Sequence, residues 1–136
     1  MRRRQETGQR RWARGFRALT LASVFTLPAA AQSPQGGTVV VGGATIGGAG
    51  NQTLINQTSD RALIDWRSFD IGKDATVAVT QPGAGSILVN RVTGNGSGTR
   101  IDGSLTANGQ VVVIDRAGIV IGRGARVDAG SFLATT

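Results

Sequence analysis

The sequence predicts an all-β fold, and within that class a right-handed parallel β-helix with short N-terminal capping strands. One observation is that residues 104–135 repeat a single unit several times, a very short strand followed by a turn. Another is that Gly, with 21 copies, is the commonest residue type and clusters between runs of β-branched residues. Gly and Asn supply the backbone conformations of tight corners, whereas β-branched residues favour strands. A chain that turns this often in one sense stacks coil upon coil as a solenoid.

Ten short strands are expected along this chain. Within the repeat they lie at 110–114, 118–121 and 126–128, and upstream at 38–41, 44–46, 52–56, 62–66, 75–79, 86–92 and 100–106. The glycine clusters between them exclude helices of ordinary length, because each Gly costs about 1 kcal/mol relative to Ala in a helix. A β-sandwich would show longer strands joined by two-residue hairpins, so a β-helix fits this pattern better.

The two ends of such a β-helix need separate treatment, because each exposes an unpaired strand edge. Residues 38–46 are expected to cover one edge, and residues 32–37 (QSPQGG) predict a flexible junction ahead of them. The sequence stops inside a strand-and-turn unit, so the β-helix domain, residues 38–136, is expected to be incomplete at its C-terminus. Trp66 and Phe69 are expected to fill the core, with ligand stacking as the alternative.

The formal charge of +7 is concentrated at the N-terminus. Seven of the 15 Lys and Arg residues lie within residues 1–17 against one acidic residue, and an apolar run at 18–31 ends in three Ala residues. This layout predicts a secretory signal peptide over residues 1–31, cleaved after Ala31, with a buried helix and a twin-arginine signal at Arg10-Arg11 as weaker alternatives. The run is shorter than the roughly 20 apolar residues that span a bilayer. No integral membrane segment is therefore expected in the mature chain.

From residue 32 onward the composition is nearly neutral, with eight basic and seven acidic residues. The basic residues alternate with acids along the chain, which is typical of a solvated surface and unlike a phosphate-binding track. No nucleic-acid partner is therefore expected.

The sequence contains no His and no Cys, which excludes the Ser-His-Asp and Cys-His catalytic arrangements, the common zinc sites and disulfides. Four carboxylates could in principle supply an acid pair, but Asp is a favoured turn residue and a surface role is preferred for Asp60, Asp65, Asp70 and Asp74. The Asp and Gly spacings fit neither a calcium loop nor a phosphate loop. Three glycosylation-type sequons are assigned to turns, without modification, at Asn51, Asn56 and Asn95. We therefore expect no catalytic residue, no cofactor and no metal.

Five ordered pieces of the sequence carry a resemblance to a known family: INQT at 55–58, IDWRSFDIG at 64–72, LVNRV at 88–92, IDGSL at 101–105 and ANGQV at 107–111. Over roughly residues 35–136 the chain closely resembles the N-terminal two-partner secretion domain of filamentous haemagglutinin-like exoproteins, although it covers only the first part of that domain. The resemblance implies a β-helix that folds outside the cell, and recognition by an outer-membrane β-barrel transporter with periplasmic domains.

The sequence departs from the family at one turn. Where the family usually has Asn-Pro-Asn-Gly, this chain has Asp115, Arg116, Ala117 and Gly118. Gly118 is kept, and Asp115 can still form an Asx-type turn. The residues expected to take part in transporter recognition are Asn108, Gly109, Asp115, Arg116, Ala117 and Gly118.

These observations predict a non-enzymatic secretion-targeting module of a large exported protein of the adhesin or toxin type. The signal peptide would engage the general export machinery, and the outer-membrane transporter would pass the chain from the periplasm to the cell surface or the medium. Two alternatives from other classes are a polysaccharide-acting β-helix enzyme and a free-standing glycan-binding adhesin fragment.

Overall fold

The computed structural model describes residues 32–136, so the predicted signal peptide at 1–31 lies outside the described residues. This part of the chain contains twelve β-strands and no helix. In chain order they are β1 (Thr38–Val41), β2 (Ala44–Ala49), β3 (Gln52–Gln57), β4 (Arg61–Trp66), β5 (Thr76–Thr80), β6 (Ile87–Val92), β7 (Thr99–Ile101), β8 (Ser104–Ala107), β9 (Gln110–Asp115), β10 (Ile119–Ile121), β11 (Arg126–Asp128) and β12 (Ser131–Thr135). The predicted all-β class is confirmed.

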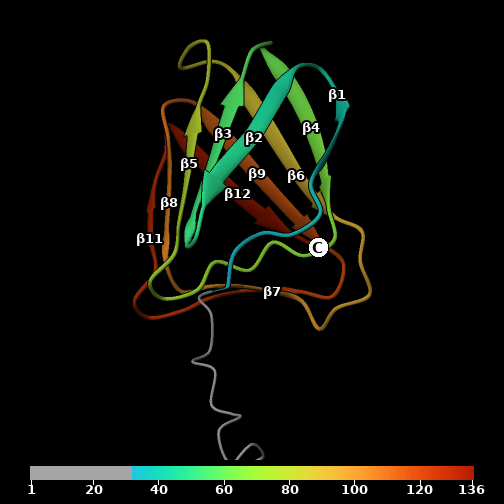
Figure 1. Ribbon diagram of the computed structural model, residues 1–136, viewed down its shortest axis with the longest axis vertical. Helices are drawn as coiled ribbons and strands as arrows, with labels where there is room; N and C mark the ends of the chain where they lie inside the picture. The colour runs from blue at the N-terminus through green and yellow to red at the C-terminus, as the bar shows by residue number, and fades with distance from the viewer. Residues whose placement is uncertain (1–31) are drawn as a thin grey trace, which may run out of the picture. The chain divides into compact units, whose positions relative to one another are not determined.

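The strands form three sheets, and the chain passes from one sheet to the next before returning one coil later (Figure 1). The sheet orders are β1-β4-β6-β9-β12, β11-β8-β5-β3-β2 and β10-β7. From β3 onward all the strand pairs are parallel, and none is between strands adjacent in the chain. The fold is therefore a parallel β-solenoid, as predicted, and it has about four turns.

The first two strands pair differently from the rest. β1 runs antiparallel to β4, and β2 runs antiparallel to β3, so each covers the first solenoid strand of its sheet. This confirms the capping expected of residues 38–46, which removes two unpaired strand edges. The second strand is longer than predicted, because it continues to Ala49 and forms a hairpin with β3.

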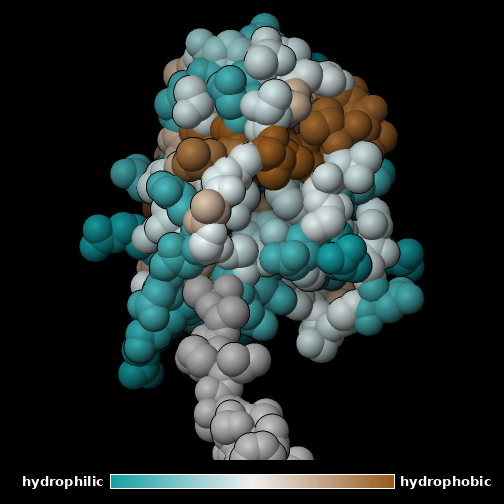
Figure 2. Space-filling view, in the orientation of Figure 1, coloured by the Kyte–Doolittle hydropathy of each residue, from teal (hydrophilic) through white to brown (hydrophobic). Residues whose placement is uncertain are grey.

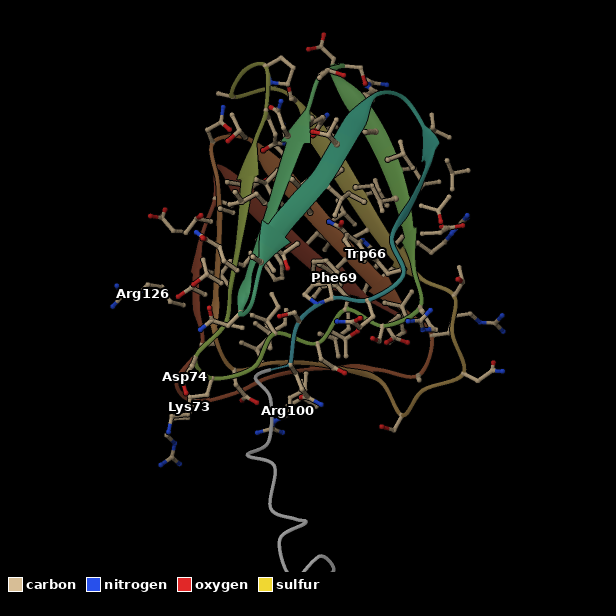
Figure 3. The ribbon with its side chains drawn as sticks, viewed as in Figure 1. Trp66, Phe69, Lys73, Asp74, Arg100 and Arg126 are labelled. Carbon is tan, nitrogen blue, oxygen red and sulfur yellow. The ribbon has the colours of Figure 1, made fainter. Side chains whose placement is uncertain are left out.

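The core lies between the sheets and consists of aliphatic side chains stacked coil on coil. In β9 burial alternates, with Val111 and Val113 almost fully buried, as a half-buried strand requires. Trp66 and Phe69 are each 1% exposed and meet edge to face, with ring centroids 5.4 Å apart (Figure 3). Both aromatic residues therefore fill the core, as preferred from the sequence.

One predicted strand, at 100–106, is divided into β7 and β8 by a corner at Gly103. A side chain there would collide with the carbonyl oxygens of Gly72 and Ala75, one coil earlier. The amide of Gly103 donates to the carbonyl of Ile71 at 3.2 Å. The prediction of a single strand at 100–106 was wrong because the alternation of polar and apolar residues continues through the corner at Gly103.

Residues 32–37, predicted as a flexible junction, are held along the solenoid. The amide of Gln35 donates to the carbonyl of Ser68, and the amide of Arg67 donates to the carbonyl of Gln35, both at 2.9 Å. The carbonyl of Gln32 accepts from the amide of Gly72 at 2.9 Å. Pro and Gly in this stretch thus allow a close backbone path beside the 67–72 segment.

We expect a core substitution to cost far more stability than the same substitution on the surface. Leu105, at 0% exposed, should lose about 2–5 kcal/mol of unfolding free energy as Leu105→Ala, from lost burial and a residual cavity. The matched control Leu54→Ala, at a side chain 44% exposed, should change it by about 0.5 kcal/mol or less. Urea unfolding followed by circular dichroism measures both, and equal losses would contradict the described core.

Candidate recognition surface

The six residues predicted for transporter recognition fall at two corners of the solenoid. Asn108 and Gly109 precede β9, whereas Asp115 to Gly118 close its far end. A strand rises about 3.3 Å per residue, so the two corners lie about 20 Å apart. The structure therefore brings four of the residues together in one turn and leaves the other two at the opposite edge of the sheet.

The corner before β9 is hydrogen-bonded to the preceding coil of the solenoid. The side chain of Asn108 forms a closed pair with the backbone of Gln81: its Oδ1 accepts from the Gln81 amide at 2.7 Å, and its Nδ2 donates to the Gln81 carbonyl at 2.9 Å. The Gly109 amide donates to Oε1 of Gln81 at 2.8 Å. Both residues are thus used to stack one coil on the next.

Gln81 belongs to a polar column inside the solenoid that the sequence pattern did not predict. It is 5% exposed, and Gln57, one coil earlier, is 3% exposed. The Gln81 amide group donates to Gln57 Oε1 and to the Gln110 carbonyl, both at 3.1 Å. The Gln57 amide group donates in turn to the carbonyls of Ser59 and Ile87, at 2.7 and 3.1 Å. The column links three successive coils through buried hydrogen bonds.

The corner after β9 is an Asx turn, as predicted for Asp115. Its Oδ1 accepts from the Ala117 amide at 2.9 Å, and its backbone carbonyl accepts from the Gly118 amide at 2.9 Å. Asp115 is only 5% exposed, and its Oδ2 accepts from the Thr99 hydroxyl at 2.8 Å. Gly118 has φ = 114°, a conformation that disfavours any side chain. Asp115 and Gly118 therefore shape the turn, while Arg116 and Ala117 are exposed at its tip.

The tip of this turn borders a groove of about 740 Å³. The groove runs between the turn and the loop that follows β6, and its lining includes Arg91, Asn95, Gly96, Arg116 and Ala117. A hollow lined by two arginines, Asp115 and several apolar residues thus lies beside the one turn at which this sequence departs from the family pattern.

A family model described as the TPS secretion domain matches residues 30–136. The chain belongs to the TPS secretion domain family. This confirms the resemblance to a two-partner secretion domain inferred from the sequence.

The secretion domain is also similar to two curated proteins and to one solved structure, all from Haemophilus influenzae. A heme/hemopexin-binding protein of strain ATCC 51907 / DSM 11121 / KW20 / Rd is 42% identical over 118 residues, which are 87% of this chain and 13% of that protein. A second heme/hemopexin-binding protein is 43% identical over 86 residues, 63% of this chain and 9% of its own length. The crystal structure of the HMW1 secretion domain matches with a TM-score of 0.70 and 38% identity, over 75% of this chain and 27% of that one.

The secretion domain also carries an aliphatic column on the outer face of the sheet that contains β9. Cross-strand register aligns Val41, Leu63, Val89, Val112 and Leu133 on successive strands. These side chains are exposed or half-buried, and Leu133 is 56% exposed. Apolar side chains also gather where β1 and β2 cross the face seen in Figure 2. The signal for the column was present in the sequence as continuous apolar runs such as Val111 to Ile114, which indicate strands that are apolar on both faces.

The four carboxylates considered for catalysis are engaged separately. Asp65 forms a bidentate pair with Arg91, at 2.7 and 2.9 Å, and Asp70 accepts from the Arg100 amide at 2.7 Å. Asp60 accepts weakly from the Ser86 hydroxyl at 3.4 Å, and Asp74 is exposed at a corner (Figure 3). Each has a surface or turn role, as preferred from the sequence.

Neither a metal-binding cluster nor a helix suited to cross a membrane is found within residues 32–136. This segment holds no group of three or more acidic side chains placed to bind a metal ion. Nor does any helix within it have the length and apolarity that a membrane crossing requires.

The polar column predicts a stability loss on removing Gln81. Gln81→Met keeps the length of the side chain but leaves the Gly109 amide and Gln57 Oε1 buried without their partner. Because an unsatisfied buried polar group costs about 1–3 kcal/mol, the unfolding free energy should fall by about 2 kcal/mol or more. The control Gln52→Met, at an exposed position, should change it little. An unchanged urea midpoint for Gln81→Met would contradict the column.

The ion pair predicts a small pH-dependent contribution. The hydrogen bonds from Arg91 hold the pKa of Asp65 below its ordinary value, and the carboxylate raises the pKa of Arg91. A lowered folded-state pKa means that the stabilisation is present above the unfolded pKa of about 3.9 and is lost as pH falls through the folded value. Asp65→Asn should therefore lower the melting temperature slightly near neutral pH, with the difference vanishing in strong acid. Asp74→Asn is the control, and a loss for Asp65→Asn that grows below about pH 4 would contradict the sign.

Proposed function

We propose that this secretion domain is the non-enzymatic targeting module of a larger exported protein, recognised by a dedicated outer-membrane β-barrel transporter. The observation that carries the proposal is the match of the TPS secretion domain over residues 30–136, essentially the whole described chain. The matched segment spans only 13% and 9% of the two Haemophilus proteins, so most of each relative lies outside it. We therefore assign an adhesin-type or toxin-type activity to other parts of the exported protein.

The proposed route has two stages. The signal peptide, residues 1–31, directs the chain through the general export machinery, and the mature domain then meets the periplasmic part of the transporter. Passage through the transporter leads to the cell surface or the medium. We also propose that the solenoid is right-handed, because connections between parallel strands are right-handed in nearly all proteins.

The mechanism we favour is strand addition by a segment that has not yet folded. An extended strand can pair with a free sheet edge in the transporter, with main-chain hydrogen bonds supplying affinity and side-chain pockets supplying specificity. β9 suits this role, because Val111 and Val113 face one side and Val112 and Ile114 the other. Outside the cell, each completed coil then buries aliphatic side chains against the previous coil, which disfavours backward movement.

The two corners have different parts in this proposal. Asn108, Gly109, Asp115 and Gly118 are committed to hydrogen bonds or backbone geometry within the solenoid, so their effect on recognition is through the shape of the corners. Arg116 and Ala117 present their side chains to solvent. A transporter that contacts the turn directly would contact these two.

The alternatives receive no support from the geometry of the described residues. A glycosidase needs two convergent carboxylates, whereas Asp65 pairs with the Arg91 guanidinium and Asp70 accepts from the backbone amide of Arg100. The glycan-binding alternative would need an exposed aromatic platform, yet Trp66 and Phe69 are buried.

Deletion of residues 32–136 from the full exported protein should abolish its appearance at the cell surface when the cognate transporter is co-expressed. Surface immunoblotting after protease treatment measures this, with a signal-sequence reporter as the control for passage across the inner membrane. Undiminished surface export of the deletion variant would overturn the proposed function.

Restoring the family turn should raise export. In the combined variant Asp115→Asn, Arg116→Pro and Ala117→Asn, an amide oxygen can still accept from residue 117, and a strand conformation at 115 suits a following proline. The matched control is Arg123→Ala, at the exposed corner between β10 and β11 of the same coil. We expect several-fold more surface protein for the restored turn and no change for the control. Equal export would show that the turn is structural only.

A further inference from the structure

The sequence contains two Asn-Gly pairs in the described region, and the structure places them in opposite situations. Asn95-Gly96 lies in the loop after β6, and both residues are exposed. Asn108-Gly109 lies at the corner before β9, where Gly109 is buried. We propose that Asn95 is a site of spontaneous deamidation, and that the stacking contacts of the solenoid protect Asn108 from the same reaction.

The reaction requires only water and the chain itself. The Gly96 backbone nitrogen loses its proton to solvent base and attacks Cγ of Asn95, forming a C–N bond. The Cγ–Nδ2 bond breaks, and Nδ2 leaves as ammonia after taking up protons from water. The resulting cyclic imide is opened by water at either carbonyl, which yields aspartate or isoaspartate at position 95. The side-chain amide is thereby replaced by a carboxylate.

The Asn95-Gly96 loop leaves both reacting groups accessible. Across residues 32–136, no side-chain or loop hydrogen bond engages the Asn95 side chain or the Gly96 amide. A Cβ placed on Gly96 would have no heavy atom within 4 Å, so the space around the nucleophile is open. At the loop's start, by contrast, Gly94 packs against the Arg67 carbonyl. The loop is thus anchored at its base and unrestrained at its tip.

The Asn108-Gly109 corner holds both reacting groups. Two hydrogen bonds to the Gln81 backbone fix the Asn108 amide, and a third occupies the Gly109 nitrogen that would have to attack. The Gly83 carbonyl would also stand 2.8 Å from a Cβ on Gly109, so the corner cannot swing open freely. If each hydrogen bond slows the reaction about fivefold, the three together slow it on the order of 100-fold.

The modification would place a negative charge in the groove beside the Asp115 to Gly118 turn. Asn95 lines that groove together with Arg91 and Arg116. Arg91 is already paired with Asp65, whereas Arg116 belongs to neither of the two ion pairs found in residues 32–136. A carboxylate at position 95 therefore adds a negative charge to a hollow that contains Arg116 and Asp115, next to the exposed tip of the turn. Any effect of this charge on export rests on the proposed function.

The test is peptide mapping by mass spectrometry of the purified full chain, incubated in mildly alkaline buffer at physiological temperature. We expect Asn95 to convert on the order of 100-fold faster than Asn108 in the folded protein. In urea, where the stacking contacts are lost, the two sites should react at similar rates. Gly96→Ala, for which the loop has space, should slow conversion at Asn95 without altering the circular dichroism spectrum. Equal rates at the two sites in the folded protein, or an unreactive Asn95, would overturn the proposal.

The effect of a negative charge at position 95 on export can be tested by comparing two variants. Asn95→Asp mimics the product, and Asn95→Gln keeps an uncharged amide in a longer side chain. A difference between their export levels, measured with the cognate transporter, would support an effect of charge in the groove. Equal export of the two variants would refute that effect, whereas the modification itself is decided by the peptide map. If even the deletion of residues 32–136 left export unchanged, the proposed function would be wrong instead.

Discussion

Stacking of each strand on the strand one coil earlier, in parallel register, is the constraint on which this structure depends. The register of β4, β6 and β9 shows it most clearly: Ile64, Asn90 and Val113 follow one another on successive coils, as do Leu63, Val89 and Val112. Because the backbone hydrogen bonds run between coils, each corner must lie directly over the corresponding corner of the previous coil. The glycine corners, the buried polar column and the Asx turn all serve this requirement.

The polar column explains how the register is specified in a core that is otherwise aliphatic. Valine and isoleucine side chains pack almost equally well after a small shift along the strand, whereas a shifted Gln81 would lose partners on two neighbouring coils. Trp66 and Asn90 repeat the principle on another sheet, since the indole Nε1 donates to Asn90 Oδ1 at 2.9 Å. Buried hydrogen bonds therefore contribute specificity where apolar packing supplies most of the stabilisation.

The same architecture connects folding with the proposed export function. Strands that are apolar on both faces are costly to leave in water as an isolated chain, yet they pair readily with a sheet edge. A chain held unfolded by its transporter and then wound coil by coil satisfies both conditions. The exposed tip of the turn after β9 and the neighbouring loop at Asn95 are two of the irregular surfaces that remain once the coils have closed. Variation there changes the surface without disturbing the register.

Short β-branched runs and glycine corners are local signals, so the class of the fold and the position of most of its strands could be predicted from the amino-acid sequence alone. The sequence also indicated that Trp66 and Phe69 fill the core and that Asp115 forms an Asx turn. Three features became visible only in the folded chain: Gly103 divides a strand, Gln81 and Gln57 form one column, and the predicted recognition residues occupy two separate corners. Those features depend on contacts between residues about one coil apart, and the spacing between coils varies along the chain. Local periodicity cannot reveal which side chains a given coil will bring together.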